Sequence, residues 1–372
     1  MRTDKTIEAF FSLVSGGLWE REVSLSQFGD VDYNEVLILA EEQSVVGLVA
    51  AGLEHVTDTV VPKEVVLQFI GQAIKIEQRN SAMNHFVAEI VEKMRNAGIY
   101  TLLVKGQGIA QCYERPLWRA CGDIDLLLDR NNYERAISFL APLSESAVDN
   151  SKDTKHYSLD IGLWEVELHG TLRTQIRKRI DRIIDDIQEN ILSNTLKRVW
   201  KYNNTDIYLP TLNSDVVFIF THILQHFFRG GIGLRQLCDL GRLLWSYRDS
   251  IDKNLLYQHL IAMDLITEWK VFGLVIVDEL GLPSTEMPFY DNSTKLLKKR
   301  KNVISYILTV GNFGHNKDIS YQYSSPVIIR KIRTFLRQTK DSANLMAIFP
   351  KNATISLFNY LWIGIKGILG KN

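Results

Sequence analysis

Two carboxylates stand one residue apart at the start of an apolar run, in the segment CGDIDLLLD at residues 121–129. Side chains alternate faces along a strand, so Asp123 and Asp125 would share one face while Ile124 enters the core. Like charges this close repel each other. A fold keeps such a pair only where solvent, a basic partner or a divalent metal offsets the repulsion.

More acids follow in the segment WEVELH, residues 164–169. The same alternation puts Glu165, Glu167 and His169 on one face and the apolar residues on the other. If this strand lies beside the aspartate strand, a third carboxylate joins the pair. Three such ligands suit Mg²⁺, which keeps waters and substrate phosphates as its other ligands. Two such ions stabilise both the attacking and the leaving oxygen of a phosphoryl displacement.

The acidic pair alone is also compatible with a solvated strand end that carries two surface aspartates. Upstream, however, VKGQG ends an expected strand at Lys105 and Gly106 and opens an expected helix at Gln107. Backbone N–H groups at a helix start bind phosphate oxygens, and a neighbouring lysine adds positive charge. These residues also suit a plain strand-to-helix turn, so the phosphate interpretation depends on the two segments together.

The elements that must position these residues differ from the rest of the chain. Residues 5–98 carry apolar side chains at three- and four-residue spacing, which predicts helices, and Asn96 with Gly98 makes a helix stop. The pattern then predicts strands at 99–106, 123–129, 155–162 and 163–172, and a tight turn at Gly162 joins the last two. It also predicts a short strand or extended linker at 205–212. Helices are expected at 132–143, at 176–200 and from 213 onward. We therefore expect an α+β fold with a small mixed β-sheet core at 99–212, an N-terminal helical region at 1–98 and a C-terminal one at 213–372.

The segment LLVKGQGIAQCYERPLWRACGDIDLLL, residues 102–128, resembles the nucleotidyltransferases of the DNA polymerase beta superfamily. More narrowly, it is similar to an uncharacterised bacterial group in which a KG turn, a Tyr-x-x-Pro-x-x-Arg stretch and a DxDLL strand follow one another. Tyr113, Pro116 and Arg119 stand in that arrangement. The later VELHG and HILQHFFRGGIGLRQLCDLGRLL are similar to two further segments of the group, so the resemblance covers roughly residues 80–245.

The resemblance implies a metal centre built from carboxylates. Asp123 and Asp125 would ligate Mg²⁺, with Mn²⁺ as the alternative ion. Glu167 would be the third acid and would help to activate the acceptor hydroxyl. Glu165 shares its face and is a rival for the third position, but Glu167 matches the group's pattern.

The resemblance also implies a site for the triphosphate. The turn at Lys105, Gly106 and Gln107 would hold it, and Arg119 would clamp a phosphate because a planar guanidinium suits bidentate oxygen contacts. His169, beside the acids, joins this nucleotide-binding set. Better-known relatives carry a glycine–serine turn where this chain has KGQG, so the hydroxyl contact of that serine is absent.

A second polar cluster lies in THILQHFFRGGIGLRQLCDL, residues 221–240. His222 and His226 are four residues apart and share one helix face, but neither metal-ligand spacing nor an HExxH pattern indicates zinc. Either both are satisfied by neighbouring side chains at a domain contact, or they line the nucleotide or acceptor cleft. Arg235, a further candidate for nucleotide binding, is four residues from Asp239, and we expect the two to pair.

The composition narrows the class of protein. Lys plus Arg and Asp plus Glu both number 43, and this zero net charge argues against a nucleic-acid partner. Three unpatterned cysteines indicate neither disulfides nor a cysteine zinc site and favour the cytoplasm. The first residues do not read as a signal peptide, and no apolar run is long enough for a transmembrane segment. We expect residues 353–370 to form a helix packed on the protein, with contact to a membrane surface as the alternative.

These observations favour an enzyme that moves a nucleoside monophosphate from a nucleoside triphosphate to a hydroxyl acceptor and releases pyrophosphate. The acceptor is unidentified and is expected to be a small molecule or a protein. One alternative is a catalytically silent nucleotide-binding or protein-interaction module on the same fold. A phosphohydrolase that uses the same acids on water also fits the sequence.

Overall fold

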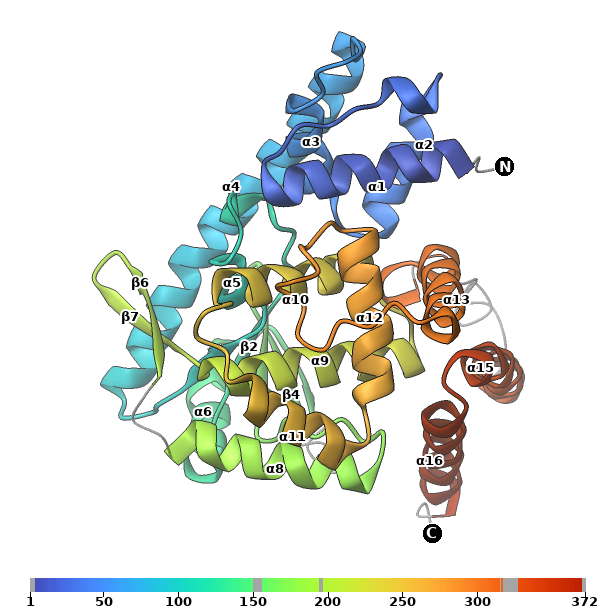
Figure 1. Ribbon diagram of the computed structural model, residues 1–372. Coiled ribbons are helices and arrows are strands. Elements are labelled where there is room, and N and C mark those ends of the chain that lie inside the picture. The colour runs from blue at the N-terminus through green and yellow to red at the C-terminus, as the bar shows by residue number, and fades with distance from the viewer. Residues whose placement is uncertain (1–3, 150–155, 194–196, 315, 317–326, 370–372) are drawn as a thin grey trace.

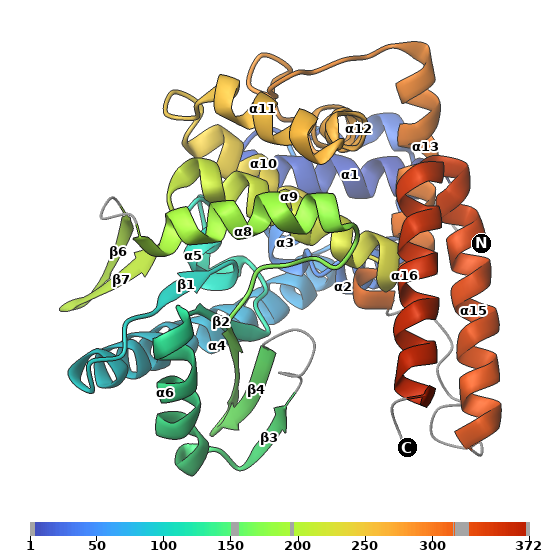
Figure 2. The ribbon, with the colours of Figure 1, turned by 90° about the horizontal axis from the view of Figure 1, so that it is seen from below.

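The computed structural model describes residues 4–149, 156–193, 197–314, 316 and 327–369. A small mixed sheet is flanked by helices from both ends of the chain (Figure 1, Figure 2). This arrangement confirms the expected α+β class. The boundaries at 98 and 212 stay predictions.

The N-terminal helices form a compact group against the long helix α4. Their bounds are α1 Asp4–Trp19, η1 Ser26–Phe28, α2 Tyr33–Glu42, α3 Val46–Glu54 and α4 Lys63–Asn96. Helices α1 and α3 touch backbone to backbone, because a Cβ at Gly17 would overlap the Leu48 carbonyl oxygen and one at Gly52 would overlap the Leu13 carbonyl oxygen. Helix α4 ends before Gly98, whose φ of +69° confirms the expected stop.

The five-stranded sheet carries the acidic segments. Its strands are β1 Leu102–Val104, β2 Asp123–Leu127, β3 Ser146–Asp149, β4 His156–Ile161 and β5 Trp164–His169, in the order β1-β2-β5-β4-β3. Strands β2 and β5 run parallel and the other pairs are antiparallel. Strand β3 was not predicted. The turn at Gly162, with φ of +59°, joins β4 to β5 as expected.

The register of β2 and β5 sets which side chains share a face. Asp123 lies opposite Glu165 and Asp125 opposite Glu167. The alternate residues of both strands enter a core that α4 covers on the other face of the sheet. This core includes Met83, Val87, Ile124, Leu126, Val166 and Leu168.

One predicted helix is wrong in its last part. Helix α8 spans Lys178–Ser193, and residues 198–200 of the helix expected at 176–200 instead belong to strand β6, Arg198–Tyr202. The sequence RVWKY contains β-branched and aromatic side chains that favour a strand. It pairs with β7 Thr205–Leu209, so the strand alternative at 205–212 is confirmed. Residues 194–196 lie outside the described residues.

The remaining elements are helical, and the expected helix at 132–143 is confirmed as α6 and η3. Their bounds are α5 Gly106–Ala110, η2 Pro116–Trp118, α6 Arg130–Leu140, η3 Ala141–Leu143, α9 Leu212–Arg229, α10 Leu234–Ser246, α11 Lys253–Met263, α12 Ile266–Asp278, α13 Thr294–Val310, η4 Asn312–Gly314, α15 Val327–Ile348 and α16 Pro350–Leu369.

The last two helices, α15 and α16, lie side by side at the margin of the molecule (Figure 2). The helix expected at 353–370 is confirmed up to Leu369, and residue 370 lies outside the described part. Near its start Ala353 is buried, whereas Phe358 and Trp362 are exposed. Among the described residues, none of the helices combines the length and apolar content that crossing a membrane requires.

Helices from both ends of the chain share one hydrophobic core. It contains Phe10 of α1, Phe220 of α9, Trp269 of α12 and Phe349. Polar contacts join the same regions, because the Trp19 indole N–H donates to the Leu280 carbonyl at 2.6 Å. The packing of the two helical regions therefore fixes α9 and α10 above the sheet.

Candidate active site

The sheet brings three predicted acids together. Asp123 and Asp125 project from β2 and Glu167 from β5, and one oxygen of each lies within 4.8 Å of the others. The expectation that the two strands are neighbours is confirmed. Glu165 lies on the same face but is exposed and is not in this group. Geometry thus supports Glu167 as the third acid.

The charge of these acids is only partly offset by protein cations. Lys105 Nζ lies 2.7 Å from Asp125 Oδ1, and Asp125 is 2% exposed. Burial alone would lower the pKa of Lys105, but Asp125, Asp123 and Glu167 raise it above its usual value. Repulsion from Asp125, aided by burial, still raises the pKa of Asp123. This surplus of negative charge is what a divalent cation would neutralise, so the residues present fit a metal.

Two histidines complete the acidic centre. His169 Nε2 lies 2.7 Å from Asp125 Oδ1 and 3.4 Å from Glu167 Oε2, while His156 Nε2 lies 3.1 Å from the same glutamate oxygen. Their rings stack with centroids 4.9 Å apart. Burial would raise the pKa of Glu167, but the hydrogen bonds from both imidazoles hold it well below its usual range.

His156 was missed by the sequence argument, although a signal for it exists. A two-residue turn at Gly162 and Leu163 pairs Ile161 with Trp164, and counting outward from that pair puts His156 opposite His169. These two imidazoles and Glu167 form a second group whose donor atoms lie within 4.8 Å of one another. Imidazole suits Fe²⁺, Ni²⁺ and Zn²⁺, whereas carboxylates suit Mg²⁺ and Mn²⁺.

The turn before α5 is strained where the phosphate site was expected. Lys105 has φ of 57° and Gly106 has φ of 42°. A Cβ at Gly106 would also press on Cys121 Sγ, so only glycine suits this position. The Gln107 side chain does not face the pocket, because its Nε2 donates to Asn80 Oδ1 at 2.9 Å. The backbone of Gln107, rather than its amide, remains for a ligand.

Asn80 of α4 is a further residue that sequence reasoning missed. Its side chain is fully buried, and its Nδ2 donates to the carbonyls of Leu117 and Arg119 at 2.7 and 2.8 Å. Its Oδ1 accepts from Gln107. One asparagine thereby ties the turn of Lys105 to the loop that carries Arg119. A lone asparagine within a long helix gives no pattern from which this role could be read.

The expected pair of Arg235 and Asp239 is wrong. Asp239 instead accepts two hydrogen bonds from Arg119, through Nε and Nη2, both at 2.7 Å, and a third from the Tyr113 hydroxyl at 2.7 Å. All three side chains are buried. Asp239 therefore pairs with Arg119, which makes two hydrogen bonds to it in a buried setting, and not with Arg235 one helical turn away. Tyr113 and Arg119 of the Tyr-x-x-Pro-x-x-Arg stretch are therefore held to α10.

Arg235 is left with a different environment. Its Nη1 donates to the Ala120 carbonyl at 2.7 Å, and among the described residues no carboxylate forms an ion pair with it. Its charge partly opposes the rise in the pKa of Asp123 that repulsion from Asp125 and burial cause. Arg119 is thus neutralised by Asp239, while Arg235 keeps a positive charge that can bind phosphate.

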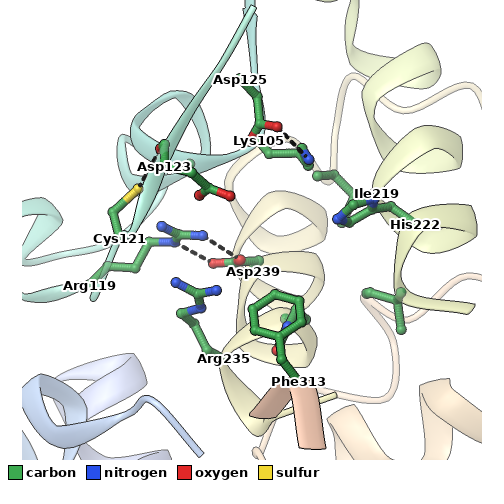
Figure 3. A pocket seen from close by; sticks show the side chains of 13 residues that line it. Lys105, Arg119, Cys121, Asp123, Asp125, Ile219, His222, Arg235, Asp239 and Phe313 are labelled. Carbon is green, nitrogen blue, oxygen red and sulfur yellow. Dashed lines mark hydrogen bonds and ion pairs between the residues drawn. The ribbon is translucent and has the colours of Figure 1, made fainter. Parts of the chain in front are cut away.

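A pocket lies between the acidic end of the sheet and helices α9 and α10 (Figure 3). The residues predicted for the site that line it are Lys105, Gly106, Arg119, Asp123, Asp125, His222 and Arg235. Glu167 and His169 adjoin it through their contacts with Asp125 and one another. Phe313, which was assigned no role from the sequence, also lines it.

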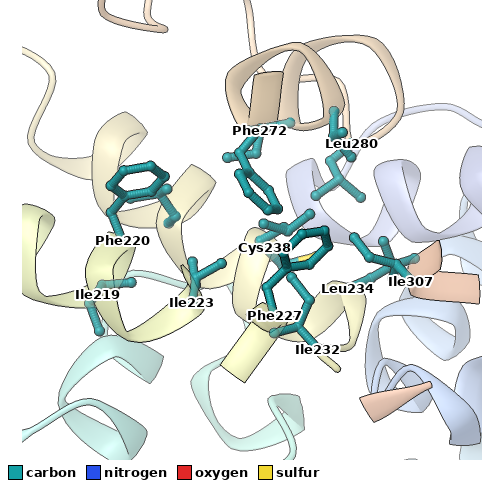
Figure 4. Close-up of a cluster of buried hydrophobic side chains, with 14 of the residues drawn as sticks. Ile219, Phe220, Ile223, Phe227, Ile232, Leu234, Cys238, Phe272, Leu280 and Ile307 are labelled. Carbon is teal, nitrogen blue, oxygen red and sulfur yellow. The ribbon is translucent and has the colours of Figure 1, made fainter. Parts of the chain in front are cut away.

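The helical wall of the pocket is held from behind by the core. Ile219, His222 and Ile223 of α9 face the pocket. Behind them, α9 and α10 pack against α12 and α13 in the cluster of Figure 4, where Phe227 meets Phe272 edge to face at 5.2 Å. This amphipathic arrangement orients His222 toward the sheet.

His222 and His226 belong to a largely apolar surrounding. Their rings meet edge to face with centroids 4.4 Å apart. Burial lowers the pKa of His222 well below its usual value and that of His226 to about 4, so both are neutral at neutral pH. Neither belongs to a metal-ligating group among the residues described. His222 lines the pocket, whereas His226 is not among its lining residues, so the cleft interpretation of the pair stays a prediction.

Comparison with known proteins agrees with this geometry. No curated protein and no solved structure matches the chain. The family described as "Uncharacterised nucleotidyltransferase" matches residues 29–269, which include the whole sheet, the acidic cluster and helices α9 and α10. The match covers the acids, the turn and every residue that lines the pocket except Phe313, and the chain belongs to this nucleotidyltransferase family.

Proposed function

We propose that the protein is a Mg²⁺- or Mn²⁺-dependent nucleotidyltransferase of the DNA polymerase beta-like superfamily. It transfers a nucleoside monophosphate from a nucleoside triphosphate to a hydroxyl acceptor. The observation that carries the proposal is the convergence of Asp123, Asp125 and Glu167 beside Lys105 at one end of the pocket. The free, buried cysteines favour a reducing, cytoplasmic setting.

Asp123, Asp125 and Glu167 would hold the metal. When bound, it supplies positive charge that stabilises the attacking and leaving oxygens. Mn²⁺ is the alternative ion, because it suits the same carboxylate ligands as Mg²⁺.

The protein side chains then have distinct tasks. Lys105 and Arg235 bind phosphate oxygens, because both are cations on the pocket wall. Arg119 holds the wall together through Asp239. The acceptor oxygen forms a bond to the α-phosphorus, the bond from that phosphorus to the bridging oxygen breaks, and pyrophosphate leaves. The Glu167 carboxylate accepts the proton of the acceptor hydroxyl.

The acceptor is a small molecule or a protein side chain. The zero net charge of the chain gives no support for a nucleic-acid acceptor. The reacting hydroxyl would lie on the side of Glu167, where the three acids converge.

One observation favours a second candidate, a catalytically silent nucleotide-binding module. Lys105 Nζ and His169 Nε2 both lie 2.7 Å from Asp125 Oδ1. Asp125 is therefore compensated by protein groups alone. In such a module the acids would serve the fold and would not respond to metal.

The experiment incubates the purified protein with Mg²⁺ or Mn²⁺ and each α-labelled nucleoside triphosphate, with and without a cell lysate as the source of acceptor. The proposal expects label on a lysate component, with release of pyrophosphate that depends on the acceptor. Asp125→Asn should abolish transfer, and the exposed Glu165→Gln on the same face is the matched control. Nucleotide binding that does not depend on metal, without transfer, would favour the silent module. Phosphate release without an acceptor would indicate a hydrolase.

A further inference from the structure

The end of the pocket away from the acids is aromatic. Phe313 lies there, beside Arg235 and on the other side of Asp239 from Asp125 (Figure 3). Its ring meets that of His226 edge to face with centroids 4.9 Å apart, and His226 meets His222 in the same way. Flat rings from α9 and η4 therefore form one continuous surface beside the pocket.

The backbone holds Phe313 in a conformation that its residue type disfavours. Its φ is 50° and its ψ is 25°, in the left-handed region that non-glycine residues seldom adopt. Burial does not explain this conformation, because the residue is 53% exposed. A strained backbone that keeps an aromatic ring accessible in a pocket indicates a surface for a ligand.

Contacts of the preceding residue, Asn312, fix the backbone that carries this ring. The Asn312 Nδ2 donates to Ser44 Oγ at 2.7 Å, and its Oδ1 accepts from Gln236 Nε2 at 2.9 Å. A Cβ at Gly233 would lie only 2.8 Å from Asn312 Cβ, so the start of α10 lies directly against the loop. The ring of Phe313 is thus presented by a preorganised backbone, which reduces the entropy lost when a ligand binds.

The two ends of the pocket match the two ends of a nucleotide. A triphosphate held by Lys105 and Arg235 leaves the nucleoside to extend toward Phe313. Nucleobases stack on aromatic side chains, and each such stack accounts for a large share of binding. His222 and His226 are neutral where they meet this end, because burial lowers the pKa of both. An uncharged flat ring therefore suits this surface better than an anion.

We propose that Phe313 is the platform on which the base of the bound nucleoside triphosphate stacks, an inference that rests on the function proposed above. Phe313 follows the region that matches the family, residues 29–269, so the platform is a property of the C-terminal part of this chain. Every base has a π face, so this contact strengthens binding without choosing the base.

The test separates binding of the base from binding of the phosphates. Dissociation constants are measured by calorimetry in Mg²⁺ for α,β-methylene ATP, α,β-methylene GTP and inorganic tripolyphosphate. The variants are Phe313→Ala and Phe313→Trp, and Phe358→Ala on α16 is the matched control for loss of an exposed phenylalanine. Phe313→Ala should weaken both nucleotides by roughly 5- to 150-fold and leave tripolyphosphate unchanged. Phe313→Trp should retain the affinity, and Phe358→Ala should not change it.

Two results would overturn the platform. In one, Phe313→Ala leaves nucleotide affinity unchanged. In the other, it weakens nucleotides and tripolyphosphate equally, which would indicate a structural role. A wild-type protein that binds neither nucleotides nor tripolyphosphate would instead reject the proposed function itself, and the platform with it. The wild-type and Phe313→Ala titrations therefore distinguish the two failures.

Discussion

The two walls of the pocket are built in opposite ways. The sheet wall collects charged groups from β2, β5 and the turn before α5, and strand register fixes their positions. The helical wall combines the apolar and aromatic side chains of Ile219, Ile223 and Phe313 with polar groups of α9 and α10, and long-range packing of α9, α10 and η4 fixes it. The difference indicates a division of work. The sheet wall carries the chemistry, and the helical wall binds the part of the substrate that does not react.

A substitution in the sheet wall should lower the turnover number, kcat. Asp125→Asn removes a metal-ligating charge while keeping a polar side chain of the same size. We expect kcat to fall by on the order of 10⁴-fold, about 5 kcal/mol of transition-state stabilisation. Steady-state transfer kinetics measure this, with Glu165→Gln as the control on the same face. Equal activity of Asp125→Asn and wild type would contradict the assignment of the reaction to this wall.

A substitution in the ion pair of Arg119 and Asp239, which links the two walls, should lower the stability of the protein. Arg119→Ala leaves the buried Asp239 without its bidentate partner, so we expect the free energy of unfolding to fall by about 3–5 kcal/mol. Chemical denaturation measures the loss. The double variant Arg119→Met with Asp239→Leu removes both charges and should cost less than the single change. A larger loss in the double variant would contradict the assignment of this pair as a compensated buried ion pair.

A substitution in the helical wall should weaken substrate binding. Arg235→Gln removes a pocket cation whose one hydrogen bond to a described group is to the Ala120 carbonyl. We expect KM for the nucleoside triphosphate to rise roughly 10- to 100-fold, because a charge-assisted hydrogen bond contributes about 1.5–3 kcal/mol. The kcat should change little and the unfolding midpoint should stay the same. A fall in kcat with an unchanged KM would place Arg235 with the sheet wall.

The smallest expected effect is a difference in pH response. His226 has a pKa of about 4 when folded against about 6.5 when unfolded, so the unfolded chain binds a proton first as the pH falls. Its contribution therefore favours unfolding increasingly as the pH falls from about 6.5 toward 4, by about 2 kcal/mol at pH 5. Urea denaturation at pH 7.5 and pH 5 measures this, and His226→Gln should lose less stability between these values. An identical loss would show that the pKa of His226 is the same in the folded and the unfolded protein.

The sheet wall could be predicted from the sequence because its information is local. Alternation along DIDLLLD and WEVELH puts the acids on one face, and the parallel register then brings Asp125 to Glu167. The hairpin register would also have given His156. The strand at 198–202 was not predicted, because the mixed charges before it indicated that the helix continued.

The helical wall was harder to predict because its contacts join distant residues. Arg235 and Asp239 have the spacing of a helical ion pair, yet Asp239 binds Arg119, which is 120 residues away in the chain. Phe313 reaches the pocket only because Asn312 is fixed by Ser44 and Gln236. No periodicity in the sequence reports such contacts.

The pairing of Arg119 with Asp239 has a consequence for the order of assembly during synthesis. All strands of the five-stranded sheet leave the ribosome before α10 does, so the loop at Arg119 emerges with a cation whose carboxylate has not yet been made. Chains fold from the N-terminus as they are synthesised. The nascent sheet must therefore keep this arginine hydrated until α10 docks, and the acidic centre reaches its final form only after the helical wall has been translated.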